Sequence, residues 1–359
     1  MMRDLQRACG GTGLDSTIFL FLLQDGITNG AIYALLGLAT VLVFAVTRVI
    51  LIPQGEFVTF GALTYAALAA GKLPGTVGLI VLMGIAAFGF ELFAMRRSLR
   101  LSRLLRAFAL FVALPLVIAG AAIALAPRRY GIAVDVLLTL MIVAPLGPYL
   151  YRIAFQPMAQ ASVLTLLIAS VGAHLALLGY SLIVFGAEGL RGPVLSDLTT
   201  SLGPLTITGQ SLSVYVVTII LIVALRLFFD RTLYGKALRA TAVNRIGARL
   251  AGIRTSLSGQ IAFLLAAAIG AVSGILLAPI TTTYYDTGFL IGLKGFVAAI
   301  IGGLASYPVT ALAALVVGFV EALSSFYASN YKEVIVFTLI VPVLMARSLA
   351  SPAVEDEQD

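Results

Sequence analysis

The chain consists of long apolar runs separated by short segments that contain charged residues, glycine or proline. The runs 56–71 and 289–304 are short and contain glycine, so each is expected to be either spanning or re-entrant. Most others approach the roughly 20 apolar residues that a helix needs to cross a bilayer. The pattern predicts an all-α polytopic membrane protein with about 10–11 transmembrane or re-entrant helices. The runs lie at 26–46, 56–71, 76–95, 107–126, 131–151, 162–186, 212–228, 257–279, 289–304, 308–327 and 332–349.

Composition supports this fold class and excludes several others. Of the 359 residues, 60% are hydrophobic and 11% are charged, whereas a soluble domain has about one quarter charged residues. An ordinary soluble enzyme, a disordered chain and an alternating β-barrel are therefore disfavoured. The net charge of +7 does not indicate nucleic acid, because the basic residues lie between apolar runs and membrane topology explains them.

The basic residues also predict an orientation. If the loop 227–256 is cytoplasmic, fifteen of the 23 Lys and Arg residues fall on the cytoplasmic side and seven on the other. This asymmetry places the N-terminus outside and the C-terminus in the cytoplasm. We expect an external N-terminal segment at 1–24, a membrane domain at 25–350 and a disordered acidic tail at 351–359.

The segment 96–130 combines a basic run with an additional apolar run. Four of its arginines repeat at helical spacing, which is typical of an anchor at the level of the lipid headgroups. A regulatory lipid site is the alternative interpretation. The basic run contains Arg96, Arg97, Arg100, Arg103 and Arg106.

Motifs for catalysis or nucleotide binding are missing from the sequence. It has no G-x-x-x-x-G-K-[ST] phosphate loop, so we expect ATP to be bound elsewhere and no cofactor in this chain. With one cysteine, Cys9, and one histidine, His174, neither an internal disulfide nor a metal site is expected. His174 has apolar neighbours and is expected to be a packed helix residue. Transport is therefore favoured over catalysis.

Two apolar segments interrupted by glycine and proline occupy comparable places in the two halves of the chain, at 52–62 and 292–308. Broken helices at membrane depth line cavities or are buried in protein, and in transporters such a pair indicates the translocation path. Close helix packing through small residues is the alternative. Ionisable residues at membrane depth are functional candidates, namely Glu56, Glu91, Asp135, Lys294 and Glu321. Lys294 is either such a functional residue or the partner of a carboxylate such as Glu321 or Glu56.

Two further segments are candidates for contacts with other molecules. Residues 235–253 mix apolar and basic side chains in an amphipathic helical pattern, with Gly252 placed to end the helix. This helix is expected to lie on the headgroups or to insert into a groove of a soluble partner. The external loop 187–211 is a connector or a landing surface for an external protein.

Five pieces of sequence in this order resemble the LivH-type permease subunits of branched-chain amino-acid ABC importers. The similarity runs from about residue 25 to 349. The quotable pieces are Gly26-Ile-Thr-Asn29-Gly30-Ala-Ile-Tyr33-Ala34-Leu, Pro53-Gln-Gly55-Glu56-Phe-Val-Thr-Phe-Gly61-Ala62, Gly235-Lys-Ala-Leu-Arg239-Ala, Ala248-Arg249-Leu-Ala-Gly252-Ile253 and Gly292-Leu-Lys294-Gly295-Phe-Val-Ala-Ala-Ile-Ile-Gly302-Gly303-Leu.

The resemblance implies a bacterial inner-membrane permease that imports branched-chain or related small amino acids. Such a chain forms one half of a heterodimeric pore with a second related permease, two cytoplasmic ATPases that bind ATP, and a periplasmic solute-binding protein. The loop 230–256 becomes a cytoplasmic coupling loop, in which the implied ATPase contacts are Gly235, Arg239, Ala248, Arg249 and Gly252. The candidate path residues are Asn29, Gln54, Glu56 and Lys294.

The sequence also departs from the family pattern. Ile246 stands where the coupling segment usually has an acidic residue, and the segment 96–130 resembles an insertion that adds one span. Two alternatives therefore remain open at this stage. One is an ABC permease for urea, amides or aromatic acids, and the other is a stand-alone ion-coupled secondary transporter.

Overall fold

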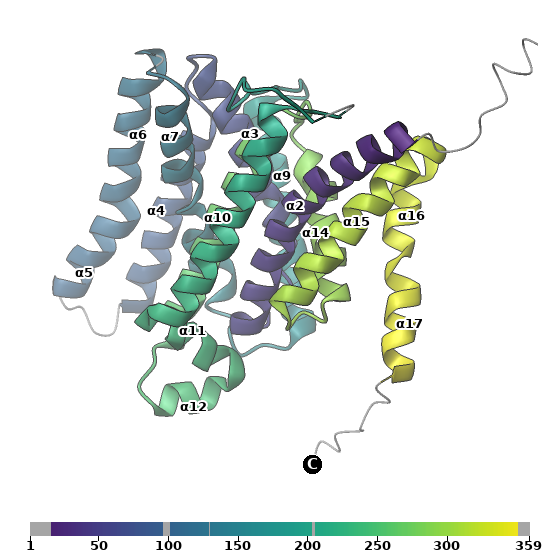
Figure 1. The fold of residues 1–359 in the computed structure, drawn as a ribbon. Helices are drawn as coiled ribbons and strands as arrows, with labels where there is room; N and C mark the ends of the chain where they lie inside the picture. Colours follow the sequence, from purple (N-terminus) through teal and green to yellow (C-terminus); the bar gives the residue numbers. More distant parts are fainter. Residues whose placement is uncertain (1–15, 96–100, 129, 203–204, 351–359) are drawn as a thin grey trace, which may run out of the picture.

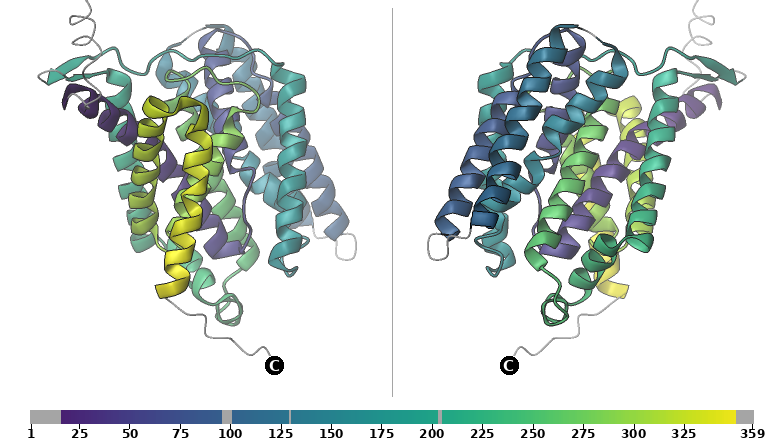
Figure 2. Two further views of the ribbon diagram at one scale, coloured as in Figure 1. Left: turned by 90° about the vertical axis from the view of Figure 1, so that its right-hand side faces the viewer. Right: turned by 90° about the vertical axis from the view of Figure 1, so that its left-hand side faces the viewer.

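The structure is a computed structural model and describes residues 16–95, 101–128, 130–202 and 205–350. Within these ranges the chain is a bundle of helices that run between two opposite ends of the molecule (Figures 1 and 2). We call the end that carries α11 and α12 the inner end, and the opposite end the outer end. The basic run at 96–100, the N-terminal residues 1–15 and the acidic tail lie outside the described residues.

The first half of the chain contributes the helices up to α9. They are α2 (Ser16–Thr47), α3 (Gln54–Ala69), α4 (Thr76–Met95), α5 (Leu101–Phe108), a π-helical turn (Ala109–Ala113), α6 (Leu114–Leu125), a 3-10 turn (Ala126–Arg128), α7 (Ile132–Val143), α8 (Leu146–Leu150), a second π-helical turn (Tyr151–Phe155) and α9 (Val163–Phe185).

A two-stranded hairpin precedes the remaining helices. Its antiparallel strands pair Thr200 with Ile207 and Leu202 with Leu205. The elements are β1 (Thr200–Leu202), β2 (Leu205–Ile207), α10 (Gly209–Arg231), α11 (Leu233–Val243), α12 (Arg245–Leu250), α13 (Thr255–Leu277), α14 (Thr287–Ile301), α15 (Tyr307–Tyr327), a 3-10 turn (Ser329–Tyr331), α16 (Lys332–Thr338) and α17 (Ile340–Ala350).

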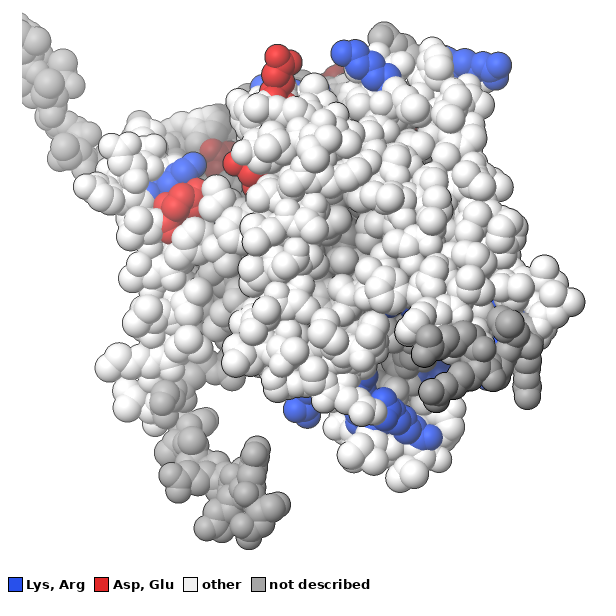
Figure 3. Space-filling model, turned by 180° about the vertical axis from the view of Figure 1, so that it is seen from behind, with Lys and Arg blue, Asp and Glu red and all other residues white. Residues whose placement is uncertain are grey.

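The predicted all-α fold is confirmed, since each of the eleven apolar runs contains helix. In the described part of the chain, nine helical segments are long and apolar enough to cross a membrane, and α14 is a shorter apolar helix. The first helix starts at Ser16, ten residues before the predicted run. The run 107–126 belongs to a continuous helical segment that also includes Arg103 and Arg106. Figure 3 shows basic side chains at both ends of the molecule, with a broad uncharged belt between them.

The two short helices, α3 and α14, are parts of complete crossings rather than re-entrant segments. The crossing that contains α3 begins with Arg48, which lines an inner-end cavity together with Asn244 and Ile246. It reaches the outer end at Gly75, whose carbonyl accepts a hydrogen bond from the Tyr180 hydroxyl at 3.0 Å. In each crossing a non-helical segment of turns and irregular backbone covers the depth that the short helix does not. These segments are 48–53 and 278–286.

The crossing that contains α14 runs in the opposite direction. The carbonyl of Ala278 accepts a hydrogen bond from the Gly192 N–H of the outer loop at 3.0 Å. At the other end, the Tyr307 ring lies 5.8 Å from the Phe229 ring near the inner end of α10. With both crossings complete, α2 begins at the outer end and α17 finishes toward the inner end (Figure 1).

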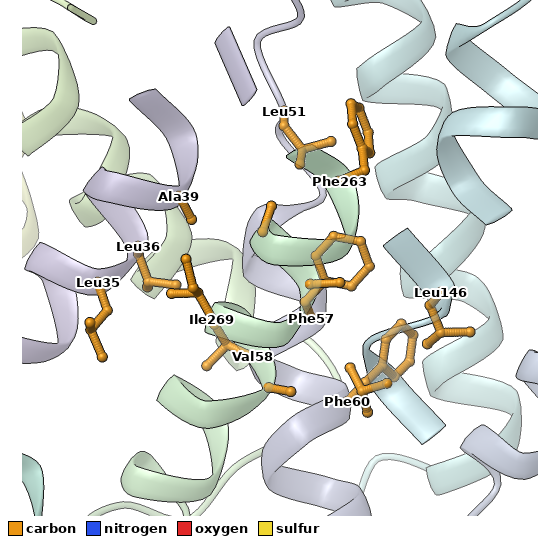
Figure 4. Close-up of a cluster of buried hydrophobic side chains, with 14 of the residues drawn as sticks. Leu35, Leu36, Ala39, Leu51, Phe57, Val58, Phe60, Leu146, Phe263 and Ile269 are labelled. Carbon is orange, nitrogen blue, oxygen red and sulfur yellow. The ribbon is translucent and has the colours of Figure 1, made fainter. Parts of the chain in front are cut away.

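The core lies where α3 is enclosed by other helices. Residues 54–68 of α3 are all buried, and Phe57, Val58 and Phe60 meet side chains of α2, α8 and α13 in Figure 4. Because α3 is buried on every side, its sequence shows no polar face. Its neighbour α13 approaches through glycine: a Cβ on Gly274 would lie 2.2 Å from the Val58 carbonyl oxygen.

The contact between α2 and α15 also depends on small residues. A Cβ on Gly318 would lie 2.4 Å from the carbonyl oxygen of Gly26 and 2.5 Å from the backbone nitrogen of Gly30. Helices in lipid gain most of their association energy from such close packing, because lipid chains are as apolar as the side chains they replace.

We therefore expect Gly318→Val to destabilise the folded protein by about 1–3 kcal/mol, because the new side chain must push α2 away. The matched control is Gly120→Val in α6, where an added Cβ meets no atom within 4 Å. Thermal unfolding of the detergent-solubilised protein, followed by size-exclusion chromatography, measures both. Equal midpoints for the two variants would contradict the packing described here.

Candidate functional site

The N-termini of the two short helices meet in the middle of the bundle. A Cβ on Gly55 would lie 2.1 Å from the Gly288 carbonyl oxygen, so the two backbones touch. The Gly288 N–H donates to the Thr59 hydroxyl at 2.9 Å. The Gln54 amide donates to the carbonyl of Ala266 at 3.1 Å, and Ala266 is the central residue of the 23-residue helix α13. We call this contact of α3 with α14 the mid-depth junction.

A buried contact between a carboxyl group and an imidazole joins the mid-depth junction to α9. Glu56 in the first turn of α3 is fully buried, and its Oε1 lies 3.0 Å from Nδ1 of His174. His174 is the central residue of α9, and its ring stacks on Phe289 of α14 with centroids 4.7 Å apart. A carboxylate is favoured at this place by the positive end of the α3 dipole, and a nearby imidazole supplies its counter-charge when protonated.

A backbone hydrogen bond adds to this attachment. Ile52 lies in the non-helical segment before α3, and its N–H donates to the Ser170 hydroxyl at 2.9 Å. Ser170 and His174 are one helical turn apart on the buried stripe of α9. The expectation that His174 is a packed helix residue holds, but its pairing with Glu56 was not predicted. Its spacing from Ser170 was the signal in the sequence that marked a common face.

Lys294 lies in a different cluster of charges. Its Nζ is 2.6 Å from Oε1 of Glu321 on α15 and 3.1 Å from Oε1 of Glu333 on α16. The Tyr33 hydroxyl donates to the other oxygen of Glu321 at 2.5 Å, and the Lys294 Nζ lies 5.8 Å from the centre of the Tyr33 ring. The predicted pairing of Lys294 with Glu321 is therefore present, whereas Glu56 pairs with His174 instead. Glu333 was not selected from the sequence.

The remaining ionisable candidates are separate from both clusters. Glu91 forms an ion pair with Arg152. Asp135 in the first turn of α7 is buried. Within the described residues, no group of three His, Cys, Asp or Glu side chains is placed to hold a metal ion.

Asn29 lies apart from the other three path candidates. It lines a cavity of about 650 Å³ at the outer end, together with Asp25 of α2, Arg191 of the outer loop and Phe326 of α15. The structure thus brings Gln54 and Glu56 together at the mid-depth junction. It places Asn29 at the outer end and Lys294 in the charge cluster between α14 and α15.

The segment 235–253 differs from the single amphipathic helix that was predicted. It forms two short helices, α11 and α12, which are separated at Asn244. The Asn244 side chain caps α12 by accepting from the Gly247 N–H at 2.8 Å, because Asn competes with the backbone and favours helix starts. Gly252 has φ of +83° and ends α12 as predicted.

The five candidate contact residues divide into buried and exposed ones. Gly235 packs against the Phe228 carbonyl, and Ala248 is 5% exposed. Arg239 bonds Asp230 at 2.7 Å, and Arg249 donates to the Thr255 hydroxyl at 3.1 Å. The large apolar side chains that are exposed here are instead Leu233, Val243, Ile246 and Leu250, with exposed fractions from 73% for Ile246 to 85% for Leu250.

Comparison with known proteins places the chain in a family. The family described as branched-chain amino acid transport system / permease component matches residues 22–344. The chain belongs to this family. The branched-chain permease LivH of Escherichia coli (strain K12) is 29% identical over 353 residues, which cover 94% of this chain and 98% of LivH. The LivH protein of Salmonella typhimurium is 32% identical over 60% of this chain and 73% of its own length.

A third relative extends the comparison. The branched-chain permease BraD of Pseudomonas aeruginosa is 26% identical over 349 residues, covering 94% of this chain and 97% of BraD. No solved structure matches the chain. As a multi-pass member of this permease family, the chain has a role in transport, in agreement with the resemblance described above.

The Lys294 cluster leads to a prediction about stability. Lys294→Met leaves the buried Glu321 without its cation, whereas Glu333 keeps Lys332 at 3.9 Å. Breaking a buried pair from one side costs about 3–5 kcal/mol. The double variant Lys294→Met/Glu321→Met removes both buried charges, so we expect it to be more stable than Lys294→Met. The control is Lys72→Met, because Lys72 is exposed in the loop before α4.

Thermal unfolding in detergent measures these variants together with Glu321→Met, which is the second single variant that the comparison needs. If the double variant loses the sum of what the two single variants lose, Lys294 and Glu321 are not energetically coupled. If it regains stability and still transports, Lys294 is a packing residue rather than part of the path.

Proposed function

We propose that this chain is the permease subunit of an ABC importer that moves branched-chain amino acids into the cytoplasm. The observation that carries the proposal is the family match over residues 22–344, together with relatives that are named as branched-chain amino acid permeases. The missing phosphate loop supports it, since the chain must then obtain energy from separate ATP-binding subunits.

The partners follow from this assignment. They are a second related permease subunit, two cytoplasmic ATPases and a periplasmic solute-binding protein, in the bacterial inner membrane. The inner end carries the basic loop between α10 and α13, so we assign it to the cytoplasm. No cofactor is proposed for this chain, because ATP is bound by the partner ATPases.

The mid-depth junction is the proposed constriction of the path. Gln54 and Glu56 lie at the centre of the bundle and are buried, so the path is closed at this level. The non-helical segments that precede α3 and α14 contain no helical hydrogen bonds that would have to break. The junction is therefore the place where the two short helices can separate. Asn29 marks the outer entrance, and Lys294 holds α14 against α15.

The coupling surface consists of Leu233, Val243, Ile246 and Leu250 on α11 and α12. These apolar side chains are exposed on two short helices that lie at the inner end of the bundle (Figure 1). Helices that insert into a groove present such anchors. Gly235, Ala248, Arg239 and Arg249 support this surface from within, through close packing and through bonds to Asp230 and Thr255.

Replacing an anchor of the coupling surface should uncouple the subunit from its ATPases. We expect Leu250→Glu to reduce ATP-driven uptake at least about tenfold, because a carboxylate cannot be buried unpaired in an apolar groove. Leu73→Glu is the matched control, since Leu73 is 53% exposed in the outer-end loop before α4. Co-purification of the ATPases and uptake are measured together, and normal values for Leu250→Glu would exclude this surface as the docking site.

Uptake of tritiated leucine tests the proposed substrate and energy source. The chain is produced with its partner subunits in cells that lack their own branched-chain uptake. We expect isoleucine and valine to compete, whereas urea and benzoate do not, and we expect an uncoupler to leave uptake intact while cellular ATP is held constant. Competition by urea or benzoate alone would identify another ABC substrate, and loss of uptake with the uncoupler would indicate an ion-coupled carrier.

A further inference from the structure

The outer-end cavity contains two opposite charges that do not neutralise each other. Asp25 and Arg191 both line it. Among the described residues, neither forms an ion pair with a charged side chain. This distinguishes the cavity from the Lys294 cluster, where Lys294 and Glu321 form an ion pair, and from Glu56, which lies 3.0 Å from His174. Unpaired opposite charges around one cavity leave room for a ligand that carries both.

The guanidinium of Arg191 is held in place from one side only. Its Nε and Nη2 donate to the carbonyl of Pro279 at 3.1 and 2.9 Å, and Nη2 also approaches the Ile280 carbonyl at 3.4 Å. Within the described part of the chain, Nη1 has no hydrogen-bond partner. An arginine that is fixed in this way presents its free N–H groups to an anion without a further cost in side-chain entropy.

Hydrogen bonds fix the walls of the cavity. The Gln210 side chain accepts from the Leu195 N–H at 3.1 Å and donates to the Leu276 carbonyl at 2.7 Å, which ties the outer loop to the end of α13. On the other wall, the Tyr215 hydroxyl of α10 bonds Thr28 of α2 at 2.8 Å. The volume of about 650 Å³ lies within the range of preformed small-molecule sites.

The remaining lining suits a small apolar side chain. Leu22, Val194 and Phe326 supply apolar surface, and Asn29 adds an amide. Pro279 and Ile280 form part of the wall. They lie near the start of the non-helical segment that leads to α14 and the mid-depth junction. The cavity therefore stands at the outer end of the chain segment that forms the proposed path.

We propose that this cavity is an entry site for the zwitterion of an apolar α-amino acid. Asp25 receives the ammonium group and the free Nη1 of Arg191 receives the carboxylate. Leu22, Val194 and Phe326 contact the side chain of the ligand. The proposal rests on the proposed function, and it assigns to the permease itself a recognition of the amino acid that would act after release from the external binding protein.

The test measures binding of leucine to the assembled complex without its binding protein. The full chain with its partner subunits is placed in nanodiscs, and saturation-transfer difference NMR follows leucine. We expect Asp25→Asn and Arg191→Gln each to weaken leucine binding at least about tenfold, since each loses one charged contact. Asp197→Asn and Arg128→Gln are the charge-matched controls, because both residues are exposed at the outer end and do not line the cavity.

Two leucine analogues test the assignment of each charge. Removal of the ammonium gives 4-methylpentanoate, and removal of the carboxylate gives 3-methylbutylamine. We expect both to compete poorly for the wild-type site. In Asp25→Asn, leucine should bind no better than 4-methylpentanoate. Asp25 is exposed and forms no ion pair with the described residues, so this variant should fold normally, whereas Arg191→Gln also removes bonds within the protein.

The outcomes separate this proposal from the proposed function. Unchanged leucine binding in both variants overturns the entry site, even when the wild-type complex takes up leucine. A variant that alters only the affinity of the external binding protein, measured through its stimulation of ATP hydrolysis, also overturns it and makes the cavity a protein-docking recess. A wild-type complex that takes up no branched-chain amino acid refutes the proposed function instead.

Discussion

The structure depends on how backbone polar groups are satisfied at membrane depth outside regular helix. Non-helical segments at 48–53 and 278–286 cross part of the bundle, and lipid offers no hydrogen bonds to such a backbone. In the segment 48–53 only Arg48 is exposed, and side chains supply hydrogen bonds to the backbone beside both short helices. Ser170 accepts from the Ile52 N–H, and Thr59 accepts from the Gly288 N–H at the start of α14. This requirement explains why α3, the most buried helix, lies at the centre and why α9 is held against it.

Close packing through glycine is the second consequence. Helices that must cover an interrupted backbone have to approach it closely, and Gly55, Gly274 and Gly288 allow contacts in which a Cβ would lie only 2.1–2.2 Å from a carbonyl oxygen. The contact of α3 with α14 therefore consists of backbone atoms and small side chains, with few large side chains that interdigitate. Such a contact separates at a lower cost than one built from interdigitated large residues, which is a useful property for a constriction that must open and close.

The sequence predicted the parts of the fold that depend on local pattern. The apolar runs located the helices, and Gly252 marked the end of α12, because both signals are contained in neighbouring residues. The break of the coupling segment at Asn244 is local as well, but its capping side chain was overlooked. The partners of the buried charges were not predictable in the same way. His174 is 118 residues from Glu56, and Glu333 reaches Lys294 only because α16 folds back beside α15.

Charges that stabilise the fold and charges that are available to a solute lie in different parts of the structure. Lys294 and Glu321 form an ion pair within the bundle, and the Glu56 carboxylate lies 3.0 Å from His174, since an isolated charge there would be costly. Asp25 and Arg191 lie at the outer end, where water reduces that cost, so they can remain apart. A path for a zwitterion needs such unpaired charges at its entrance but not at its constriction, where a strongly bound charge would stop movement. The junction is closed and its buried carboxylate has a counter-group within the bundle, whereas the entrance above it is open and its charges are separate. This arrangement fits a permease that receives its solute from outside and moves it onward only when the helices rearrange.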